Sequence, residues 1–373
     1  MTGARARLTE LQRVSWLRLI RTENVGPANF RTLINRFGSA EATLDALPRL
    51  AQRGGRRHIR IPTIAEAEDE IARIDAMGAR LVTINDPDYP PHLRHIAGPP
   101  PILTAMGGDT LTAKRTVGIV GARNASAAGR RMAQLLATDL GREGYIIVSG
   151  LARGIDAAAH HASLATGTVA VMAGGLDHIY PSENIDLAQA IVDAGGTLVT
   201  EMPLGWEPRA RDFPRRNRLV AGLSLGVVIV EAAKRSGSLI TARMALEQNR
   251  EVFVVPGSPL DPRAEGGNHL IQQGAKLVTG AQDIVAELTH ADPSRLPLFE
   301  NEEFDIGPAA MPAEPSDDER SRLLTALSHA PTATDVLIEA TGIKAPAMQI
   351  LLLEFELAGR IERSAGQLFA LRA

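Results

Sequence analysis

Apolar residues follow three different patterns along the chain. Across residues 8–84 they recur every three or four positions, as at Leu11, Val14 and Leu17, which is typical of amphipathic helices. Between residues 112 and 289 they form short continuous runs instead. These runs cover residues 116–120, 145–149, 168–173, 197–200, 226–231 and 251–256. Continuous apolar runs are typical of strands buried on both faces, so this segment predicts a doubly wound, mainly parallel α/β sheet covered by helices.

The third pattern lies near the C-terminal end. Helices are predicted at residues 319–328, 334–340 and 345–358, and two short strands follow at 360–363 and 367–371. Three helices and a hairpin in this order are typical of a small winged-helix domain.

These patterns divide the chain into four parts. We expect an all-α domain in residues 1–84, an α/β domain in 85–290, a linker in 291–318 and a winged-helix-like domain in 319–373. The linker is expected because its stretch is rich in proline and acidic residues, a composition that does not form a packed core.

Two elements of the terminal domains bear on nucleic-acid binding. The turn from Asn24 to Pro27 resembles a helix-hairpin-helix element, which binds backbone phosphate through amides; an ordinary turn is the alternative. The third helix of the C-terminal domain is mainly apolar and carries Glu354 and Glu356, whereas a recognition helix presents basic or amide side chains. Acids outnumber bases across residues 316–373, so protein contact or a structural role is favoured over duplex DNA.

Composition restricts the possible functions. A chain of 373 residues is long enough for two or three domains. Its net charge of −3 argues against coating nucleic acid by bulk charge, so any polyanion site must be local. The chain has no cysteine, which excludes disulfides and thiolate chemistry. No stretch reaches the roughly 18 apolar residues of a membrane span, and no signal-peptide pattern is present. We therefore expect a soluble, cytoplasmic protein that does not bind membranes.

Small residues and arginines follow the first three predicted strands. In chain order these are Gly121, Arg123, Ser126, Ser149, Gly150, Arg153, Gly174 and Gly175. The carboxyl ends of parallel strands meet at one edge of a sheet, and ligands bind there. Glycine lets the backbone approach a ligand closely. The sequence therefore predicts a ligand-binding edge.

A second group of candidates surrounds the fifth strand. Before that strand lie Arg215, Arg216, Asn217 and Arg218, and after it lie Ser236, Gly237 and Ser238. Guanidinium groups offer paired planar donors to an oxyanion, and the free N–H groups of a helix N-terminus favour an anion. Together they predict an anion-binding site. The alternative is a solvated arginine-rich loop beside an ordinary helix cap.

Several common chemistries do not fit these loops. The loop after the first strand carries Arg123 where a dinucleotide fingerprint has its second glycine, and no phosphate-loop motif occurs. Histidines are few and scattered, so no metal or cofactor is expected. Four acids at strand ends could act as acids or bases, but structural roles among N–H donors are equally compatible. These are Asp156, Asp177, Glu201 and Glu231. No catalytic residue is assigned.

Residues 116–275 contain an ordered series of motifs. They include Gly-x-Arg-x-x-Ser at Gly121, Gly-Gly-Leu-Asp-x-x-Tyr-Pro at Gly174, Phe-Pro-x-Arg-Asn-Arg at Phe213 and Ser-Gly-Ser-Leu-Ile-Thr-Ala at Ser236. This series resembles the DprA/Smf family of bacterial DNA-processing proteins. The resemblance implies an extended Rossmann-like central domain, a sterile-alpha-motif-like N-terminal domain and a C-terminal winged helix.

The resemblance also implies a function. Family members bind single-stranded DNA that enters the cell in natural transformation, form homodimers, and help to load the recombinase RecA against the block by single-strand-binding protein. On this chain the family's DNA-binding positions fall on Arg123 and Arg215, with Arg216, Asn217 and Arg218 completing the motif. Asn217 could instead be buried and hold its loop by hydrogen bonds.

Two other functions stay open from the residues. One is a sensor that binds a nucleotide at the same edge. The other is an N-glycosidic nucleotide hydrolase of the lysine-decarboxylase-like group, although that group's Pro-Gly-Gly-x-Gly-Thr motif is missing here. Aromatic residues make up only 3% of the chain, so binding of a strand would rest on phosphates, ignore sequence and weaken with salt. We expect a non-catalytic DNA-binding protein.

Overall fold

The computed structural model describes residues 7–290, 314–364 and 367–372. The chain divides into two compact units. One lies within Asp69–Asn301, and the other combines Leu8–Glu68 with Glu302–Ala373. We call the first the sheet unit and the second the terminal unit.

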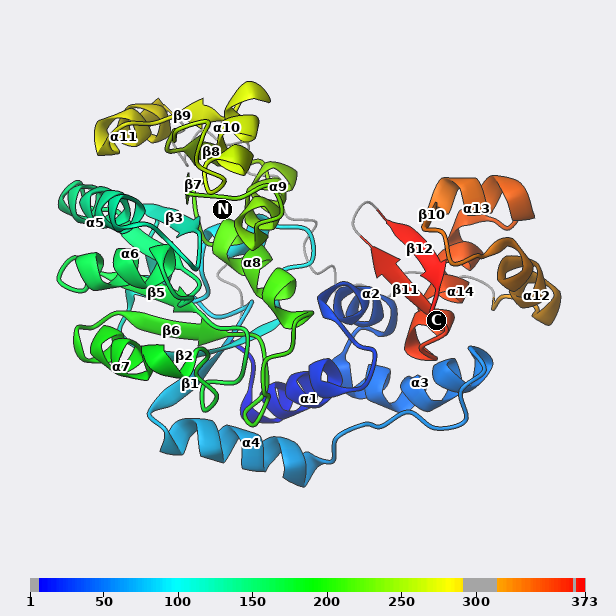
Figure 1. The fold of residues 1–373 in the computed structure, drawn as a ribbon. Coiled ribbons are helices and arrows are strands. Elements are labelled where there is room, and N and C mark those ends of the chain that lie inside the picture. Colours follow the sequence, from blue (N-terminus) through cyan, green and yellow to red (C-terminus); the bar gives the residue numbers. More distant parts are fainter. Residues whose placement is uncertain (1–6, 291–313, 365–366, 373) are drawn as a thin grey trace. The chain divides into compact units, whose positions relative to one another are not determined.

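A nine-stranded sheet forms the centre of the sheet unit (Figure 1), with the strand order β1-β2-β6-β5-β4-β3-β7-β8-β9. The strands are β1 Ala79–Thr83, β2 Ile102–Gly107, β3 Thr116–Gly121, β4 Ile146–Ser149, β5 Thr168–Val171, β6 Thr197–Thr200, β7 Gly226–Val230, β8 Glu251–Val254 and β9 Lys276–Leu277. All neighbours from β6 to β9 are parallel, whereas β1 and β2 are antiparallel additions. The predicted doubly wound, mainly parallel α/β domain is confirmed.

Helices cover both faces of the sheet because its central strands are apolar on both sides. The helices of this unit are α5 Ala127–Arg142, α6 Ile155–Ser163, α7 Ile185–Asp193, α8 Asp212–Gly222, α9 Gly237–Glu247, α10 Glu265–Gln272 and α11 Ala281–His290. α4 Ile64–Ala76 spans the boundary between the two units. Residues of α5, α6 and α11 join those of β3, β4 and β7 in one apolar cluster. On the opposite face, α8 and α9 pack against each other (Figure 1).

The first strand lies earlier in the chain than expected. β1 pairs antiparallel with β2, with Ala79 opposite Met106 and Thr83 opposite Ile102. The structure thus differs from the domain boundary predicted at residue 84, because this strand belongs to the sheet. The prediction followed helical periodicity, which ends at α4, and five residues of strand were too short to show a period of their own.

The terminal unit joins the two ends of the chain. Its helices are α1 Glu10–Arg21, α2 Pro27–Phe37, α3 Ala40–Arg53, α12 Asp317–Ala326, α13 Thr334–Thr341 and α14 Ala345–Leu357. A small sheet has the order β10-β12-β11, formed by β10 Thr332–Ala333, β11 Ile361–Ser364 and β12 Leu368–Leu371. The N-terminal helices and the C-terminal winged helix that the sequence predicted are both confirmed.

The expected linker, residues 291–318, falls mostly outside the described residues. Its last part is described from residue 314 onward, and α12 already begins there at Asp317. Ser316 caps this helix by accepting from the backbone N–H of Glu319, whose side chain accepts from the backbone N–H of Ser316. This reciprocal capping box fixes the start of α12.

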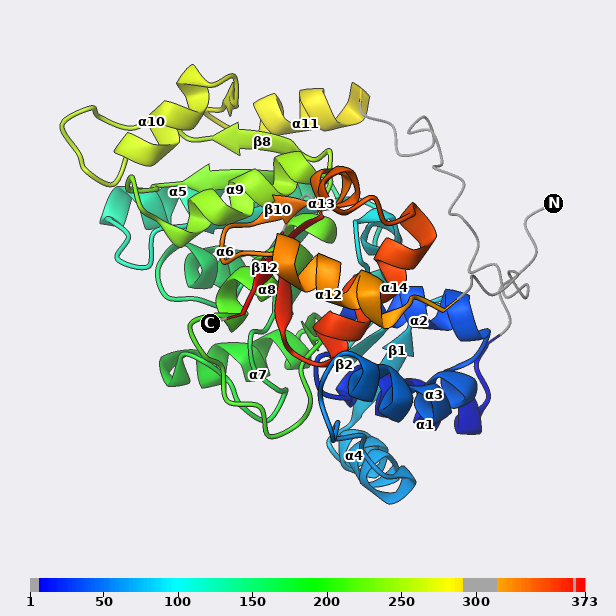
Figure 2. The same ribbon diagram turned by 90° about the vertical axis from the view of Figure 1, so that its right-hand side faces the viewer.

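α14 packs against α3 (Figure 2), and a mostly buried ion pair joins it to α12. Glu354 is fully buried, and Arg320 of α12 donates to both of its carboxylate oxygens, at 2.9 and 3.1 Å. A Cβ at Gly54 would overlap the Glu354 carbonyl oxygen. Glycine at this position therefore lets the end of α3 approach α14 closely.

In the described part of the chain, no single helix has both the length and the apolar character of a membrane span. α13 and α14 have this length and apolar character only when they are taken together, and the chain bends by 113° between them.

One imidazole is fully buried under the sheet. His160 in α6 has no exposed surface, and its Nδ1 lies 2.7 Å from Oγ1 of Thr168. Burial, reinforced by the nearby positive charge of Arg216, lowers the pKa of His160 to about 3. The imidazole is therefore neutral in the folded protein at neutral pH.

Replacing Glu354 should destabilise the terminal unit. Glu354→Ala leaves the guanidinium of Arg320 without its bidentate partner, and we expect the free energy of unfolding to fall by about 3 kcal/mol. Glu339→Ala removes an exposed carboxylate from α13 and should change it by less than about 0.5 kcal/mol. Denaturant titration measures both values, and equal effects would contradict a stabilising role of the ion pair.

The buried imidazole should make stability depend on pH. Below pH 6.5 the unfolded state binds a proton at His160 that the folded state rejects until about pH 3, so stability is full above pH 6.5 and falls as pH decreases. The loss contributed by this residue should approach about 1.4 kcal/mol per pH unit. His160→Asn keeps a group near Thr168 and should remove that part of the slope between pH 6 and 4. Identical slopes in urea titrations of both proteins would refute the assignment.

Candidate functional site

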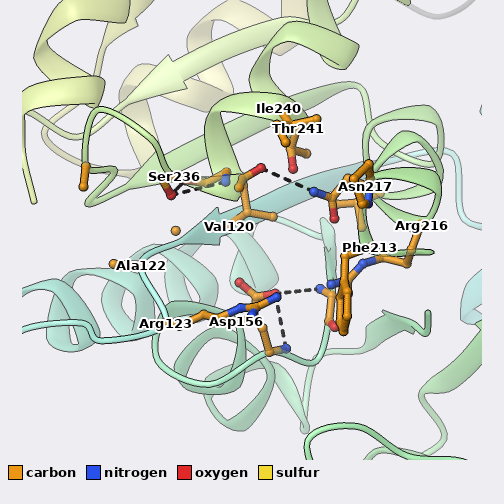
Figure 3. Close-up of a pocket in the computed structure, with 18 of the residues that line it drawn as sticks. Val120, Ala122, Arg123, Asp156, Phe213, Arg216, Asn217, Ser236, Ile240 and Thr241 are labelled. Atoms are coloured by element: carbon orange, nitrogen blue, oxygen red, sulfur yellow. Dashed lines mark hydrogen bonds between the residues drawn. The ribbon is translucent and has the colours of Figure 1, made fainter. Parts of the chain in front are cut away.

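A cavity of about 820 Å³ opens at the carboxyl ends of β3, β4 and β7 (Figure 3). The loop after β3 contributes Arg123, α8 contributes Phe213 and Asn217, and the start of α9 contributes Ser236. A smaller cavity of about 330 Å³ adjoins it and shares Arg123, Phe213 and Arg216 as lining residues. The predicted sheet edge is therefore hollowed.

Two glycines allow the backbone to close around this cavity. A Cβ at Gly121 would overlap the carbonyl oxygen of Val230 on the neighbouring strand. A Cβ at Gly150 would overlap the guanidinium of Arg216. Both positions require glycine for lack of space.

Arg216 lies beneath the cavity rather than in solvent. It is 5% exposed, and its Nη1 donates to the carbonyl oxygens of Gly150 and, at 2.9 Å, Val171. Burial lowers the pKa of Arg216 to about 10, so the side chain is still charged at neutral pH. One guanidinium therefore connects the loop after β4 to the end of β5.

Asp156 completes this buried network. Its Oδ2 accepts from the backbone N–H groups of Gly150 at 3.1 Å and Ala152 at 3.4 Å. Burial raises the pKa of Asp156, and the charge of Arg216 opposes that rise. The carboxylate, which the sequence left open as an acid or base, holds the loop after β4.

The other predicted arginines differ in exposure. Arg123 is exposed, with its guanidinium 5.1 Å from the ring centre of Phe213. Arg215 is also exposed but is not among the residues that line either cavity. Arg153 lines the smaller cavity and pairs with Glu183. Arg218 is mostly buried, paired with Glu201, and donates to the carbonyl of Gly98.

The start of α9 borders the cavity with small polar residues. Ser236 caps the helix and accepts from the backbone N–H of Ser238 at 3.3 Å. Gly237 has open space where a Cβ would be, so a ligand can approach its backbone. Asn217 donates to the carbonyl of Gly237 at 3.4 Å and thus connects α8 to α9.

The structure brings together only part of the predicted set. The residues that line one or both cavities are Gly121, Arg123, Gly150, Arg153, Arg216, Asn217, Ser236, Gly237 and Ser238. Ser126, Ser149, Gly174, Gly175, Arg215 and Arg218 lie outside both linings. Ser126 caps α5 and contacts Glu231, and Ser149 is buried with its hydroxyl on the carbonyl of Ile119.

Several lining residues had no assigned role in the sequence analysis. They are Asn124, Tyr180, Phe213, Ile240, Thr241 and Arg263. Phe213 is the first residue of the arginine motif, and this position in the sequence could have indicated a role at the site. In the structure its ring meets that of Tyr180 edge to face, with 5.4 Å between the ring centres. Arg263 comes from a distant loop, where it pairs with Asp261. No local pattern indicates its proximity to α8.

Among the residues that the structure describes, no group of three or more histidine, aspartate or glutamate side chains could hold a metal ion. The site offers guanidinium groups, amides, hydroxyls and the aromatic rings of Tyr180 and Phe213. Such groups suit an anionic, planar ligand.

Comparison with known proteins agrees with the motifs. Residues 80–289 match the family described as DNA recombination-mediator protein A. Residues 10–72 match a DprA-like N-terminal HHH domain, and residues 307–367 match a DprA winged helix domain.

Individual relatives extend over most of the chain. Protein Smf of Escherichia coli is 38% identical over 312 residues, 82% of this chain and 81% of that protein. DNA processing protein DprA of Bacillus subtilis is 47% identical over 221 residues, 58% of this chain and 74% of that protein.

Solved structures give the same result. DNA processing protein A of Streptococcus pneumoniae matches with a TM-score of 0.58 and 34% identity, covering 76% of this chain and 99% of that one. DNA processing protein A of Helicobacter pylori, described for its single-stranded-DNA binding mode, matches with a TM-score of 0.52 and 30% identity over 57% of this chain and 96% of that one. The chain belongs to the DprA/Smf family of DNA recombination-mediator proteins.

Proposed function

We propose that this protein binds single-stranded DNA without sequence specificity at the carboxyl edge of its sheet. The observation that carries the proposal is the cavity with exposed Arg123 on one side and the open backbone of Gly237 on the other. A guanidinium and helix-terminal amides both favour phosphate. The single-stranded-DNA binding described for the Helicobacter pylori relative supports the same ligand.

In this proposal exposed and buried arginines have different roles. Arg123 and Arg215 contact phosphates, because both guanidinium groups are exposed. Arg216 positions the loop after β4 and adds positive potential from below. Phosphate contacts carry no sequence information and release counterions, so binding should be indifferent to sequence and weaken with salt.

Phe213 supplies a face on which a base can stack. Its ring lines both cavities and is fixed by Tyr180 on one side and the Arg123 guanidinium on another. Base–aromatic stacking tolerates every base. A single platform is consistent with a chain that has few aromatic residues.

A non-catalytic role is supported by the partners of the strand-end acids. Asp156 accepts from backbone amides, Glu201 pairs with Arg218, Glu231 accepts from Ser126, and Asp177 accepts from the backbone N–H of Gly205. All four therefore have structural partners. The hydrolase alternative requires a free carboxylate at the site. The sensor alternative requires only a cavity of the size of a mononucleotide, and competition by dTMP distinguishes it from strand binding.

The wider role we propose is that of a cytoplasmic recombination mediator. It would bind incoming DNA in natural transformation and help to load RecA, with single-strand-binding protein as a further partner; the family description as a recombination mediator supports this. We also propose a homodimer through the edge near β9, where Leu260 is 93% and Leu277 47% exposed. Exposed large apolar residues favour burial in an interface.

Reversing two charges should abolish strand binding. In Arg123→Glu/Arg215→Glu, two phosphate contacts become repulsive, and the affinity for labelled oligo-dT should fall at least about a hundredfold. The thermal unfolding midpoint should stay within a few degrees, because both side chains are exposed. Fluorescence anisotropy at several salt concentrations, with dTMP as competitor, measures the affinity.

The matched control is Arg31→Glu/Arg49→Glu. It makes the same change in net charge on exposed arginines of α2 and α3 and should bind oligo-dT like the parent. If Arg123→Glu/Arg215→Glu bound oligo-dT as tightly as the parent, the assignment of the strand-binding site to the sheet edge would be wrong. Full competition by dTMP against the parent would favour the sensor instead.

Removing the aromatic ring of Phe213 should weaken the binding of a strand that carries bases and should leave the binding of an abasic strand unchanged. Phe213→Leu keeps an apolar side chain but loses stacking, and the affinity for oligo-dT should fall by about 1–3 kcal/mol. Affinity for an abasic strand of equal length should hardly change, and Phe213→Tyr should bind oligo-dT more tightly than the abasic strand, as the parent does. A parent protein that binds both strands equally would contradict the stacking role.

A further inference from the structure

Two arginines lie directly opposite each other at the base of the C-terminal hairpin. The antiparallel register of β11 and β12 pairs Ile361 with Leu371, and the next pair outward is Arg360 with Arg372. The backbone N–H of Arg372 donates to the carbonyl of Arg360 at 2.9 Å, which confirms this pairing. Both side chains therefore project from the same face of the ladder, and both are exposed.

Like charges at directly opposed positions repel and destabilise a hairpin. Neither Arg360 nor Arg372 has an acidic partner within the described residues. Glu362 lies two residues along the same face, yet it makes no ion pair in the described part of the chain. The guanidinium of Arg360 lies 5.5 Å from the ring centre of Phe355, and this contact does not neutralise its charge. The pair therefore concentrates positive charge.

A third arginine reaches the same place from the N-terminal half of the unit. A Cβ at Gly359 would lie 3.6 Å from Nη1 of Arg56 and 3.7 Å from Nη1 of Arg372. A Cβ at the neighbouring Gly55 would lie 3.2 Å from Nη1 of Arg360. Arg56 uses Nη2 to pair with Glu23, so its charge is partly compensated. The adjacent Arg57 is exposed.

The predicted hairpin between α1 and α2 fixes this arrangement. Asn24, in a left-handed conformation with φ of 61°, donates to the carbonyl of Leu357 at the end of α14. Its Oδ1 lies 3.5 Å from Nη1 of Arg372. The following helix, α2, begins at Pro27 without a side-chain cap. The turn between α1 and α2 therefore holds the base of the C-terminal hairpin in place through Asn24.

We propose that Arg56, Arg360 and Arg372, which we call the junction cluster, form a second binding site for the phosphate backbone of DNA. The proposal goes beyond strand binding at the sheet edge, because this site belongs to the terminal unit. Guanidinium groups from two halves of that unit converge, and among the described residues no carboxylate forms an ion pair with Arg360 or Arg372. A phosphodiester backbone offers oxyanions that can bridge two such groups and relieve their repulsion.

The acidic composition of the C-terminal domain does not oppose this site. Glu354 is buried and pairs with Arg320, and Glu356 is mostly buried and pairs with Arg363. Asp317 and Asp318 pair with arginines within α12. Much of the negative charge is thus neutralised inside the domain or lies on α12, while Arg360 and Arg372 form no ion pair within the described residues.

The test uses the full chain with the sheet edge disabled, in the Arg123→Glu/Arg215→Glu background. Binding of labelled duplex and of oligo-dT of equal length is measured by anisotropy between 50 and 200 mM salt, about the range in which phosphate contacts change affinity strongly. Residual binding to at least one form is expected. Adding Arg360→Glu/Arg372→Glu should reduce it at least about tenfold and flatten its salt dependence, whereas Arg31→Glu/Arg49→Glu should not.

A single substitution separates binding from structure. Arg372→Glu places opposite charges on the two opposed positions, so the thermal unfolding midpoint should be equal to or above that of the parent, while DNA binding weakens. Comparison of the labelled duplex with oligo-dT shows whether the junction cluster binds the phosphate backbone of duplex or of single-stranded DNA. The second site would be overturned if the Arg123→Glu/Arg215→Glu protein shows no residual DNA binding, or if Arg360→Glu/Arg372→Glu leaves that binding unchanged. Neither result would affect the sheet-edge site, which is tested separately.

Discussion

The candidate site depends on one buried cation. The guanidinium of Arg216 donates to carbonyl oxygens of Gly150 and Val171, which follow or end two neighbouring parallel strands. A buried charge is tolerated only where hydrogen bonds and an opposite charge compensate it, and the nearby Asp156 provides that charge while holding the same loop through its amides. Gly150 must lack a side chain for this to fit. The shape of the cavity follows from these requirements.

Adjacent residues of one arginine motif consequently do different things. Successive side chains on a helix point about 100° apart, so α8 directs Arg215 to solvent and Arg216 into the protein. Arg218 turns to another side and pairs with Glu201. A run that looks uniformly basic in sequence therefore contains one exposed arginine, one buried arginine that supports the loop after β4, and one arginine whose charge is compensated by Glu201.

The terminal unit shows the same separation of local from net charge. Its buried carboxylates are compensated by Arg320 and Arg363, whereas Arg360 and Arg372 are opposed to each other at the rim of the small sheet. Helix–hairpin contacts at Asn24 and the close approach at Gly54 bring the two ends of the chain together. The junction cluster exists only because residues more than 300 positions apart meet there.

By itself the sequence determined the order and type of the main elements. Continuous apolar runs identified the buried parallel strands, helical periodicity identified the terminal helices, and the motifs at Gly121, Gly174, Phe213 and Ser236 identified the edge where the cavity lies. These features are local, because strand burial, turns and helix caps depend on neighbouring residues. Tertiary structure decided what local patterns do not encode. It placed β1 in the sheet, buried Arg216 and Ser149, brought Arg263 to the cavity and set Arg360 against Arg372. Exposure and pairing of a charge depend on long-range packing, and spacing along the chain does not specify that packing.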